Sequence, residues 1–156
     1  MGDILAWDNA RLEAVHDYIQ WLFPLPEPSA FNAVAPVLLA EDIAAFRSDP
    51  VLQGRLLAAF RRMLRFYGFE LGTDLGTDGA RPEVLEAHDF AVRTREWLTP
   101  GNHNMLRITR VLRCVASLGL PAHARAFLTA LERLYDAGSA SVIGALTMRY
   151  WRDAIG

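Results

Sequence analysis

The sequence contains no lysine, and all 16 of its basic side chains are arginines. This absence excludes Schiff-base catalysis, a phosphate-binding loop that ends in Gly-Lys-Ser/Thr, and a Ser-Lys nucleophile pair, because each of these needs an ε-amine. Arginine alone therefore supplies the fixed positive charge of this chain. Its planar guanidinium suits two-pronged binding of carboxylates and phosphates.

Cysteine is equally scarce, since Cys114 is the only one. The chain therefore forms no internal disulfide and no cysteine-based zinc site, as is typical of a reducing compartment. Cys114 lies in a helical pattern, and we interpret it as a small helix residue in preference to a thiolate activated by neighbouring arginines. The sequence also lacks a basic targeting region at its start and an apolar run of about 18 residues. We expect a soluble, cytoplasmic protein with no membrane span.

Motifs of known enzyme and metal sites are missing as well. There is no Gly-x-Ser-x-Gly elbow for a serine nucleophile, and the histidines lack the paired spacing of a helix-borne metal site. These histidines are His16, His88, His103 and His123. The acids Glu83, Glu86 and Asp89 recur every three residues, which predicts a solvated helix face. The sequence thus predicts no catalytic residue, no cofactor and no metal site.

What the sequence does contain is a strong helical pattern. Its 156 residues are 52% hydrophobic and 22% charged, with a net charge of −2, which is typical of one domain with its own core. Apolar residues recur every three or four positions between glycine and proline breaks. The expected helices are 9–23, 41–47, 50–68, 82–97, 102–119, 121–136 and 141–154. We therefore predict an all-α, single-domain helical bundle of about six or seven helices over residues 1–156.

The two long helices at 50–68 and 102–119 have clear boundaries. Asp49 can cap the first helix, Pro50 suits its first turn and Gly68 ends it, while Asn102 or Asn104 can cap the second. Each helix has an apolar arc that predicts core positions. The arcs are Leu52, Leu56, Phe60, Met63 and Tyr67 on the first helix, and Ile108, Val111, Leu112, Val115 and Leu118 on the second.

Two loops stand out between the helices. The Pro-rich loop at 24–39 is too long for a structureless connection, so we expect it to be ordered and to pack through Phe23, Leu25 and Phe31. Residues 72–79 repeat Gly-Thr-Asp, which predicts a mobile, solvated loop. Their aspartates lack the spacing of an EF-hand calcium loop.

Arginines gather on the outer faces of the same two helices. The two sets are Arg61, Arg62 and Arg65 on helix 50–68, and Arg107, Arg110 and Arg113 on helix 102–119. Together they can form two rails for a phosphate, a carboxylate or a nucleic-acid backbone. The alternative is ordinary surface charge in a chain without lysine. Aromatic residues leave a similar choice, because Tyr18, Trp21 and Trp97 can be core residues or the walls of a partly open pocket.

Four stretches together resemble the conserved region of the opioid growth factor receptor family. They are residues 18–25 (YIQWLFPL), 66–68 (FYG), 103–112 (HNMLRITRVL) and 118–120 (LGL). Their order and spacing extend the resemblance from residue 18 to the last helix, and the first stretch is the most specific. The resemblance implies a binding domain whose vertebrate members are described as enkephalin receptors associated with the nucleus and growth inhibition. It implies no catalytic residue. This chain shows no repeat-rich tail and no lysine-rich localisation signal, so we do not expect nuclear targeting or growth control.

The resemblance also singles out one helix start. His103, Asn104, Arg107 and Arg110 lie inside the family-like string, where they can form a corner that recognises an anion or carboxylate. In the alternative, His103 or Asn104 caps the helix while the arginines pair with acids on a neighbouring helix.

Our leading hypothesis is a non-enzymatic, receptor-like domain that recognises a peptide, a protein or a small anionic ligand in a groove near the first and fifth helices. Arginines would bind a carboxylate or phosphate between apolar walls. The predicted ligand-binding residues are Tyr18, Trp21, Trp97, His103, Asn104, Arg107 and Arg110. A second hypothesis is nucleic-acid binding by the arginine rails, which salt dependence would reveal. A third is an uncharacterised enzyme, which requires a buried pocket with perturbed carboxylates or histidines.

Overall fold

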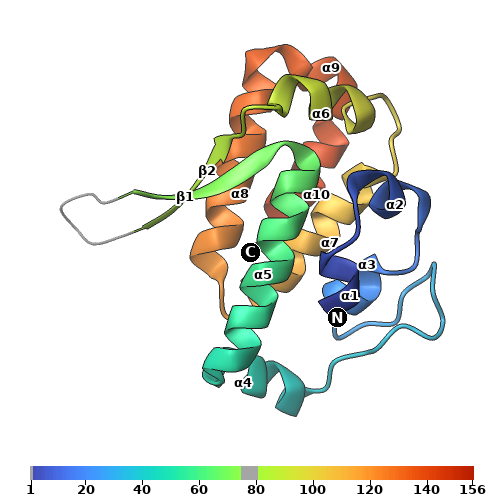
Figure 1. Cartoon of the computed structure of the whole chain (residues 1–156), viewed down its shortest axis with the longest axis vertical. Helices are drawn as coiled ribbons and strands as arrows, with labels where there is room; N and C mark the ends of the chain where they lie inside the picture. The colour runs from blue at the N-terminus through green and yellow to red at the C-terminus, as the bar shows by residue number, and fades with distance from the viewer. Residues whose placement is uncertain (1, 75–80) are drawn as a thin grey trace.

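The computed structural model describes residues 2–74 and 81–156, with helices packed around one core and a two-stranded sheet beside α8 (Figure 1). The early elements are α1 (Gly2–Leu5), α2 (Asn9–Ala14), α3 (Ile19–Leu22), α4 (Ala40–Ser48), α5 (Pro50–Tyr67), β1 (Phe69–Asp74) and β2 (Arg81–Glu86). The later ones are α6 (Phe90–Trp97), α7 (Asn104–Ser117), α8 (Pro121–Leu134), the π-helical turn η1 (Tyr135–Ser139), α9 (Ala140–Ile143) and α10 (Ala145–Asp153). In the described part of the chain, no helix has both the length and the hydropathy that crossing a membrane requires.

Helix α5 has the boundaries that the sequence predicts. Asp49 Oδ1 accepts a hydrogen bond from the Val51 N–H at 2.7 Å, and Pro50 occupies the first turn. At the other end, Gly68 adopts a left-handed conformation with φ +88°, which an L-residue with a side chain rarely adopts. Asp49 and Gly68 thus fix where α5 begins and ends.

The core lies between α5, α7 and α8 and confirms the two predicted apolar arcs. Four of the five predicted α5 residues and all five on the α7 arc are buried, and Leu52 is partly buried. Two tryptophans complete this core, with their indole N–H groups paired to backbone. Trp97 donates to Tyr67 O at 3.0 Å and Trp151 donates to Met105 O at 3.1 Å. Both therefore bury a large ring without an unpaired donor.

The expectation of an all-α fold is wrong, because β1 and β2 form an antiparallel hairpin with Phe69 opposite Glu86. Residues 82–97, predicted as one helix, are strand β2 followed by helix α6. The turn at Gly68 directs the chain straight into β1, and the Ala87 N–H donates to Gly68 O at 2.8 Å. Strand pairing and burial of Val84 outweigh the helix-starting preference of Pro82, since an edge strand tolerates a proline. The predicted solvated helix face of Glu83, Glu86 and Asp89 is therefore not formed.

The expected number of six or seven helices is also wrong, because two predicted helices are interrupted. The helix expected at 9–23 ends at Ala14 and resumes at Ile19, since Val15 has an extended backbone. The helix expected at 141–154 is divided by Gly144, whose φ of +79° is outside the helical range. The first break exposes backbone carbonyl groups that the site described below uses.

The Pro-rich loop is ordered, as predicted. Leu25 pairs with Val37 in a parallel bridge, and the Leu38 N–H donates to Leu25 O at 3.0 Å. Phe23 and Leu25 are buried, but the expected packing of Phe31 is wrong, because its side chain is 82% exposed. A local turn, in which the Phe31 N–H donates to Ser29 Oγ at 3.2 Å, accompanies this exposed position. Of the predicted mobile loop, residues 72–74 belong to β1, and residues 75–79 lie outside the described residues.

Candidate functional site

A groove of about 440 Å³ lies between α7 and residues 16–31, and its walls come from distant parts of the sequence. The α7 wall carries His103, Leu106, Arg107, Thr109, Arg110 and Arg113. The other wall combines apolar and polar side chains from His16, α3 and the Pro-rich loop. Its apolar members include Ile19, Leu25, Pro28 and Phe31, and its polar members include His16, Gln20, Glu27 and Ser29. This volume is in the range of small-molecule and short-peptide pockets.

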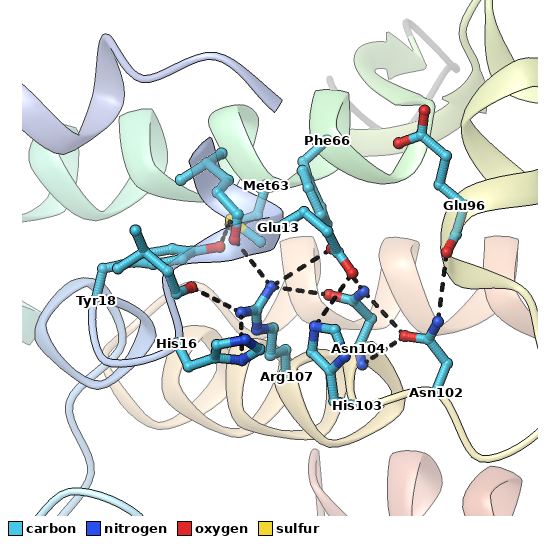
Figure 2. Close-up of polar contacts among 12 residues, drawn as sticks. Glu13, His16, Tyr18, Met63, Phe66, Glu96, Asn102, His103, Asn104 and Arg107 are labelled. Carbon is cyan, nitrogen blue, oxygen red and sulfur yellow. Dashed lines mark hydrogen bonds and ion pairs between the residues drawn. The ribbon is translucent and has the colours of Figure 1, made fainter. Parts of the chain in front are cut away.

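The polar centre of this region is Arg107, which is only 5% exposed. Its Nη1 donates to Leu12 O at 3.1 Å, and its Nη2 donates to Val15 O at 2.9 Å (Figure 2). Carbonyl groups in the last turn of a helix have no donor within that helix. Arg107 therefore completes the hydrogen bonding of the end of α2 and fastens this helix onto α7.

The helix start predicted to bind an anion is filled by a carboxylate of the protein itself. Asn104 Nδ2 donates to Glu13 Oε2 at 3.0 Å, and the same oxygen lies 3.8 Å from Arg107 Nη1. The Asn104 N–H donates to Asn102 Oδ1 at 2.9 Å, so Asn102 pairs the first amide of α7, while the side chain of the N-cap residue His103 makes no capping hydrogen bond. Arg107 thus faces an acid on a neighbouring helix, as in the alternative interpretation.

His103 belongs to the same cluster. Its Nε2 lies 3.3 Å from Glu13 Oε1, at an ion-pair distance but without the geometry of a hydrogen bond. Its ring meets that of His16 edge to face, with 5.0 Å between the centroids. Burial, and next the charge of Arg107, lower the pKa of His103, while Glu13 opposes the shift. Among residues 2–74 and 81–156, no three His, Cys, Asp or Glu side chains gather to hold a metal ion.

Exposure of the α7 arginines increases along the helix. Arg110 is half-buried and its Nη1 donates to Phe23 O at 3.1 Å, while burial lowers its pKa. Within the described part of the chain, no carboxylate lies at ion-pair distance from Arg110. Arg113, one turn further, pairs with Glu27 Oε1 at 2.5 Å. Arg110 is therefore a groove arginine whose charge is not paired directly with a carboxylate of the described residues.

The six arginines of the two sets do not form two continuous exposed rails. Arg107 is buried, as described above, and on α5 the guanidinium of Arg62 donates to Trp7 O at 2.6 Å and Asn9 Oδ1 at 2.9 Å. Of the α5 set, Arg61 and Arg65 are exposed. A phosphate backbone that follows both helices would therefore not contact Arg107.

The predicted aromatic residues lie apart from one another. Tyr18 is buried under the guanidinium of Arg107, 5.4 Å from ring centroid to Cζ, and its hydroxyl donates to Met63 Sδ at 3.8 Å. Burial raises the pKa of Tyr18 to about 12. Trp97 lies in the core, whereas Trp21 is 51% exposed and does not line the groove. Of the seven predicted residues, the groove thus brings together His103, Arg107 and Arg110, with Asn104 buried beside them.

Several groove residues were missed by the sequence reasoning. Gln20 and Leu106 lie inside the family-like strings, and each breaks the expected pattern, since Gln20 is a buried polar residue and Leu106 an exposed apolar one. Glu27 lies between two prolines in a segment that the sequence marks as ordered. The two prolines restrict the backbone at Glu27, and this restriction is the sequence signal that could have pointed to it.

Comparison with known proteins identifies relatives of this groove-bearing chain. Residues 4–152 match the family model described as the opioid growth factor receptor (OGFr) conserved region. The opioid growth factor receptor of Rattus norvegicus is 46% identical over 109 residues, which cover 70% of this chain and 18% of that protein. The Homo sapiens receptor is 42% identical over 109 residues, with 70% and 15% covered.

A second group of relatives carries the name opioid growth factor receptor-like protein 1. The Xenopus tropicalis protein is 36% identical over 112 residues, which cover 72% of this chain and 20% of that protein. This chain thus spans a fifth or less of the length of these three relatives. No solved structure matches the chain. Because the family match covers nearly all of its residues, the chain belongs to the opioid growth factor receptor conserved-region family.

Proposed function

We propose that this domain is a non-enzymatic, receptor-like module that binds a short peptide carrying a carboxylate in the groove between α7 and residues 16–31. The observation that carries the proposal is an apolar groove in which Arg110 faces no acid at ion-pair distance within the described residues. The names of the curated relatives, which call them receptors, support a peptide or protein ligand in preference to a substrate.

The groove offers two kinds of contact to such a peptide. Ile19, Leu25 and Leu106 provide apolar surface, whose burial contributes about 25 cal/mol per Å² removed from water. Arg110 provides a charge-assisted hydrogen bond to the carboxylate, and this bond gains strength because its guanidinium is half-buried. Arg107 positions the wall from beneath through its bonds to Leu12 and Val15.

Calorimetric titration with enkephalin tests this proposal, because the peptide is available with a free carboxyl end and with that end amidated. A charge-assisted hydrogen bond contributes about 1.5–3 kcal/mol, so we expect the acid to bind about 10- to 100-fold more tightly than the amide. Arg110→Ala removes this preference. Arg55→Ala is the matched control, since Arg55 is an exposed arginine on α5 outside the groove.

The outcomes of that titration separate the two parts of the proposal. Equal affinity for acid and amide would show that the carboxylate is not recognised, although the groove binds peptide. If a protein with native circular dichroism binds neither form of enkephalin, the proposal that the groove binds this kind of short peptide is refuted. Melting curves of Arg110→Ala are needed beside the titration, because its Nη1 also donates to Phe23 O.

We also propose that the domain is located in the cytoplasm. Support comes from its single cysteine, Cys114, which is free and buried. Such usage is typical of a reducing compartment. Fractionation of host cells followed by immunoblotting tests the location, and recovery in the secreted or membrane fraction would contradict it.

A further inference from the structure

One ion pair connects the two walls of the groove. Glu27, from the Pro-rich loop, has its Oε1 at 2.5 Å from Nη1 of Arg113 on α7, and both residues line the groove. A carboxylate of the protein is therefore already bound to an arginine of the surface on which the proposed ligand would place its own carboxylate.

We infer that Glu27 occupies the carboxylate subsite of the groove in the unliganded chain and is displaced by the carboxylate of the ligand. This inference rests on the proposed function and adds a built-in competitor to it. The subsite consists of Arg113 and Arg110, one turn apart on α7. The ligand class that it selects is a peptide with a free carboxyl group that reaches both guanidinium groups.

The electrostatics of the subsite agree with this assignment. Glu27 acts on Arg110 as well as on Arg113, since its negative charge opposes the pKa lowering that burial imposes on Arg110. Without an anion, two guanidinium groups one turn apart repel each other, and Arg113 contributes to that lowering. A carboxylate beside them relieves this repulsion, and Glu27 supplies one through its contact with Arg113.

The ion pair between Arg113 and Glu27 is weak enough for a ligand carboxylate to replace Glu27. The Arg113 and Glu27 side chains are 53% and 40% exposed, and ion pairs as exposed as this contribute little to stability because water screens them. The neighbours Pro26 and Pro28 restrict the backbone at Glu27, so its carboxylate is presented to Arg113 at low entropic cost.

Contacts of the Pro-rich loop allow Glu27 to withdraw without disturbing the core. The loop is tied at its base by Leu38 N–H to Leu25 O, and further along by Asn32 Nδ2 to Asp17 O at 3.3 Å. Phe31 and Val34, in the loop between Leu25 and Leu38, are 82% and 79% exposed. Movement of this part of the loop therefore gives up little buried apolar surface. Displacement of Glu27 therefore opposes ligand binding only weakly.

Titration of the wild type and of Glu27→Gln with the acid and amide forms of enkephalin tests the inference. Removing the competing charge should raise affinity for the acid by about two- to fivefold, as the strength of exposed ion pairs implies, and should raise it more than affinity for the amide. Glu41→Gln, an exposed acid on α4 outside the groove, is the matched control. In an Arg113→Ala background, Glu27→Gln should raise affinity for the acid less than it does in the wild type, because the ion-pair partner of Glu27 is gone and only its longer-range effect on Arg110 remains.

Each result of this experiment decides the matter. Equal affinity of wild type and Glu27→Gln for the acid, or a lower affinity of the variant, overturns the competition while peptide binding stands. Because Gln has nearly the size of Glu, an equal rise for acid and amide shows that the charge of Glu27 hinders binding without competing with the ligand carboxylate, which also overturns the competition. If neither protein binds either peptide, both the proposed function and this inference fail. Binding of the acid by Glu27→Gln alone supports both.

Discussion

Arg107→Ala is the most demanding test of the structure. The sequence placed Arg107 on an outer stripe of a helix, where its removal would cost little stability. In the structure the same guanidinium is buried and donates to Leu12 O, Val15 O and Asn104 Oδ1. The substitution therefore leaves three acceptors without their donor and Glu13 without a nearby positive charge.

The expected loss of stability is large. A buried polar group left unpaired costs about 1–3 kcal/mol, and three acceptors lose their donor here, while the loss of the charge beside Glu13 adds little because that side chain is a third exposed. We expect Arg107→Ala to lower the free energy of unfolding by about 3–5 kcal/mol, because water entering from the groove compensates part of the loss. At about 2–4 °C per kcal/mol for a chain of this size, the melting temperature should fall by roughly 6–20 °C.

Urea unfolding followed by far-ultraviolet circular dichroism measures this loss directly. Arg113→Ala is the matched control on the same helix, and we expect it to cost about 1 kcal/mol or less, because its ion pair is half-exposed. Arg107→Lys keeps the charge, but its side chain cannot bond both backbone carbonyl groups. We therefore expect its loss of stability to lie between those of Arg107→Ala and Arg113→Ala. An Arg107→Ala variant as stable as Arg113→Ala would refute the clamp between α2 and α7.

Three further predictions follow from backbone geometry and burial. Gly68→Ala should lower the free energy of unfolding by about 1–3 kcal/mol in urea, because φ is +88° and an added Cβ would lie 2.9 Å from Arg93 Cβ; an unchanged midpoint would contradict this. The pKa of His103 is lowered from 6.5, so the unfolded chain binds more protons and stability rises with pH from the folded pKa up to 6.5. His103→Gln should reduce the increase in the free energy of unfolding with pH, measured by urea unfolding across this pH range. Burial also lowers the pKa of His123, which supplies the rest of the increase. An unaltered pH dependence in His103→Gln would show that His103 does not contribute to it. Burial raises the pKa of Cys114 to about 12, so a thiol reagent should react slowly with the folded protein and fast in urea, and rapid labelling of the native state would contradict this burial.

Sequence reasoning succeeded where burial follows directly from periodicity. The apolar arcs of α5 and α7 were predicted because a helix in contact with a core needs apolar residues at those positions. It failed at β2, because pairing with β1 is a non-local contact that no local preference reports. Residues 83–86 read polar, apolar, apolar, polar, which fits a helix equally well. Only Val84 of β2 is buried, so the strand leaves almost no alternation in the sequence.

For the candidate site, the sequence predicted the helix that carries the arginines but misjudged the surroundings of that helix. A helical projection assumes that the side opposite the core faces water. In this fold α2 and residues 15–16 cover the first turns of that side, so Arg107 is buried while Arg113 remains exposed. Arg107 and Arg110 both line the groove, but Arg107 is not open to solvent as its place on the stripe implied, and binding of a ligand by either residue stays a prediction. Trp21 and Trp97 show the same limit, since aromatic spacing does not distinguish surface from core.

The bonds of Arg107 join parts of the chain that are 92 and 95 residues apart. The two groove walls are therefore distant in the sequence and meet only when the chain folds. An isolated peptide with residues 104–117 would carry all three α7 arginines and still form no groove. Binding and docking of the N-terminal segment are therefore linked equilibria, since a ligand that touches both walls favours only molecules in which they meet. Such a ligand would slow hydrogen exchange of amides near α2 and α3, far along the chain from the arginines that hold it.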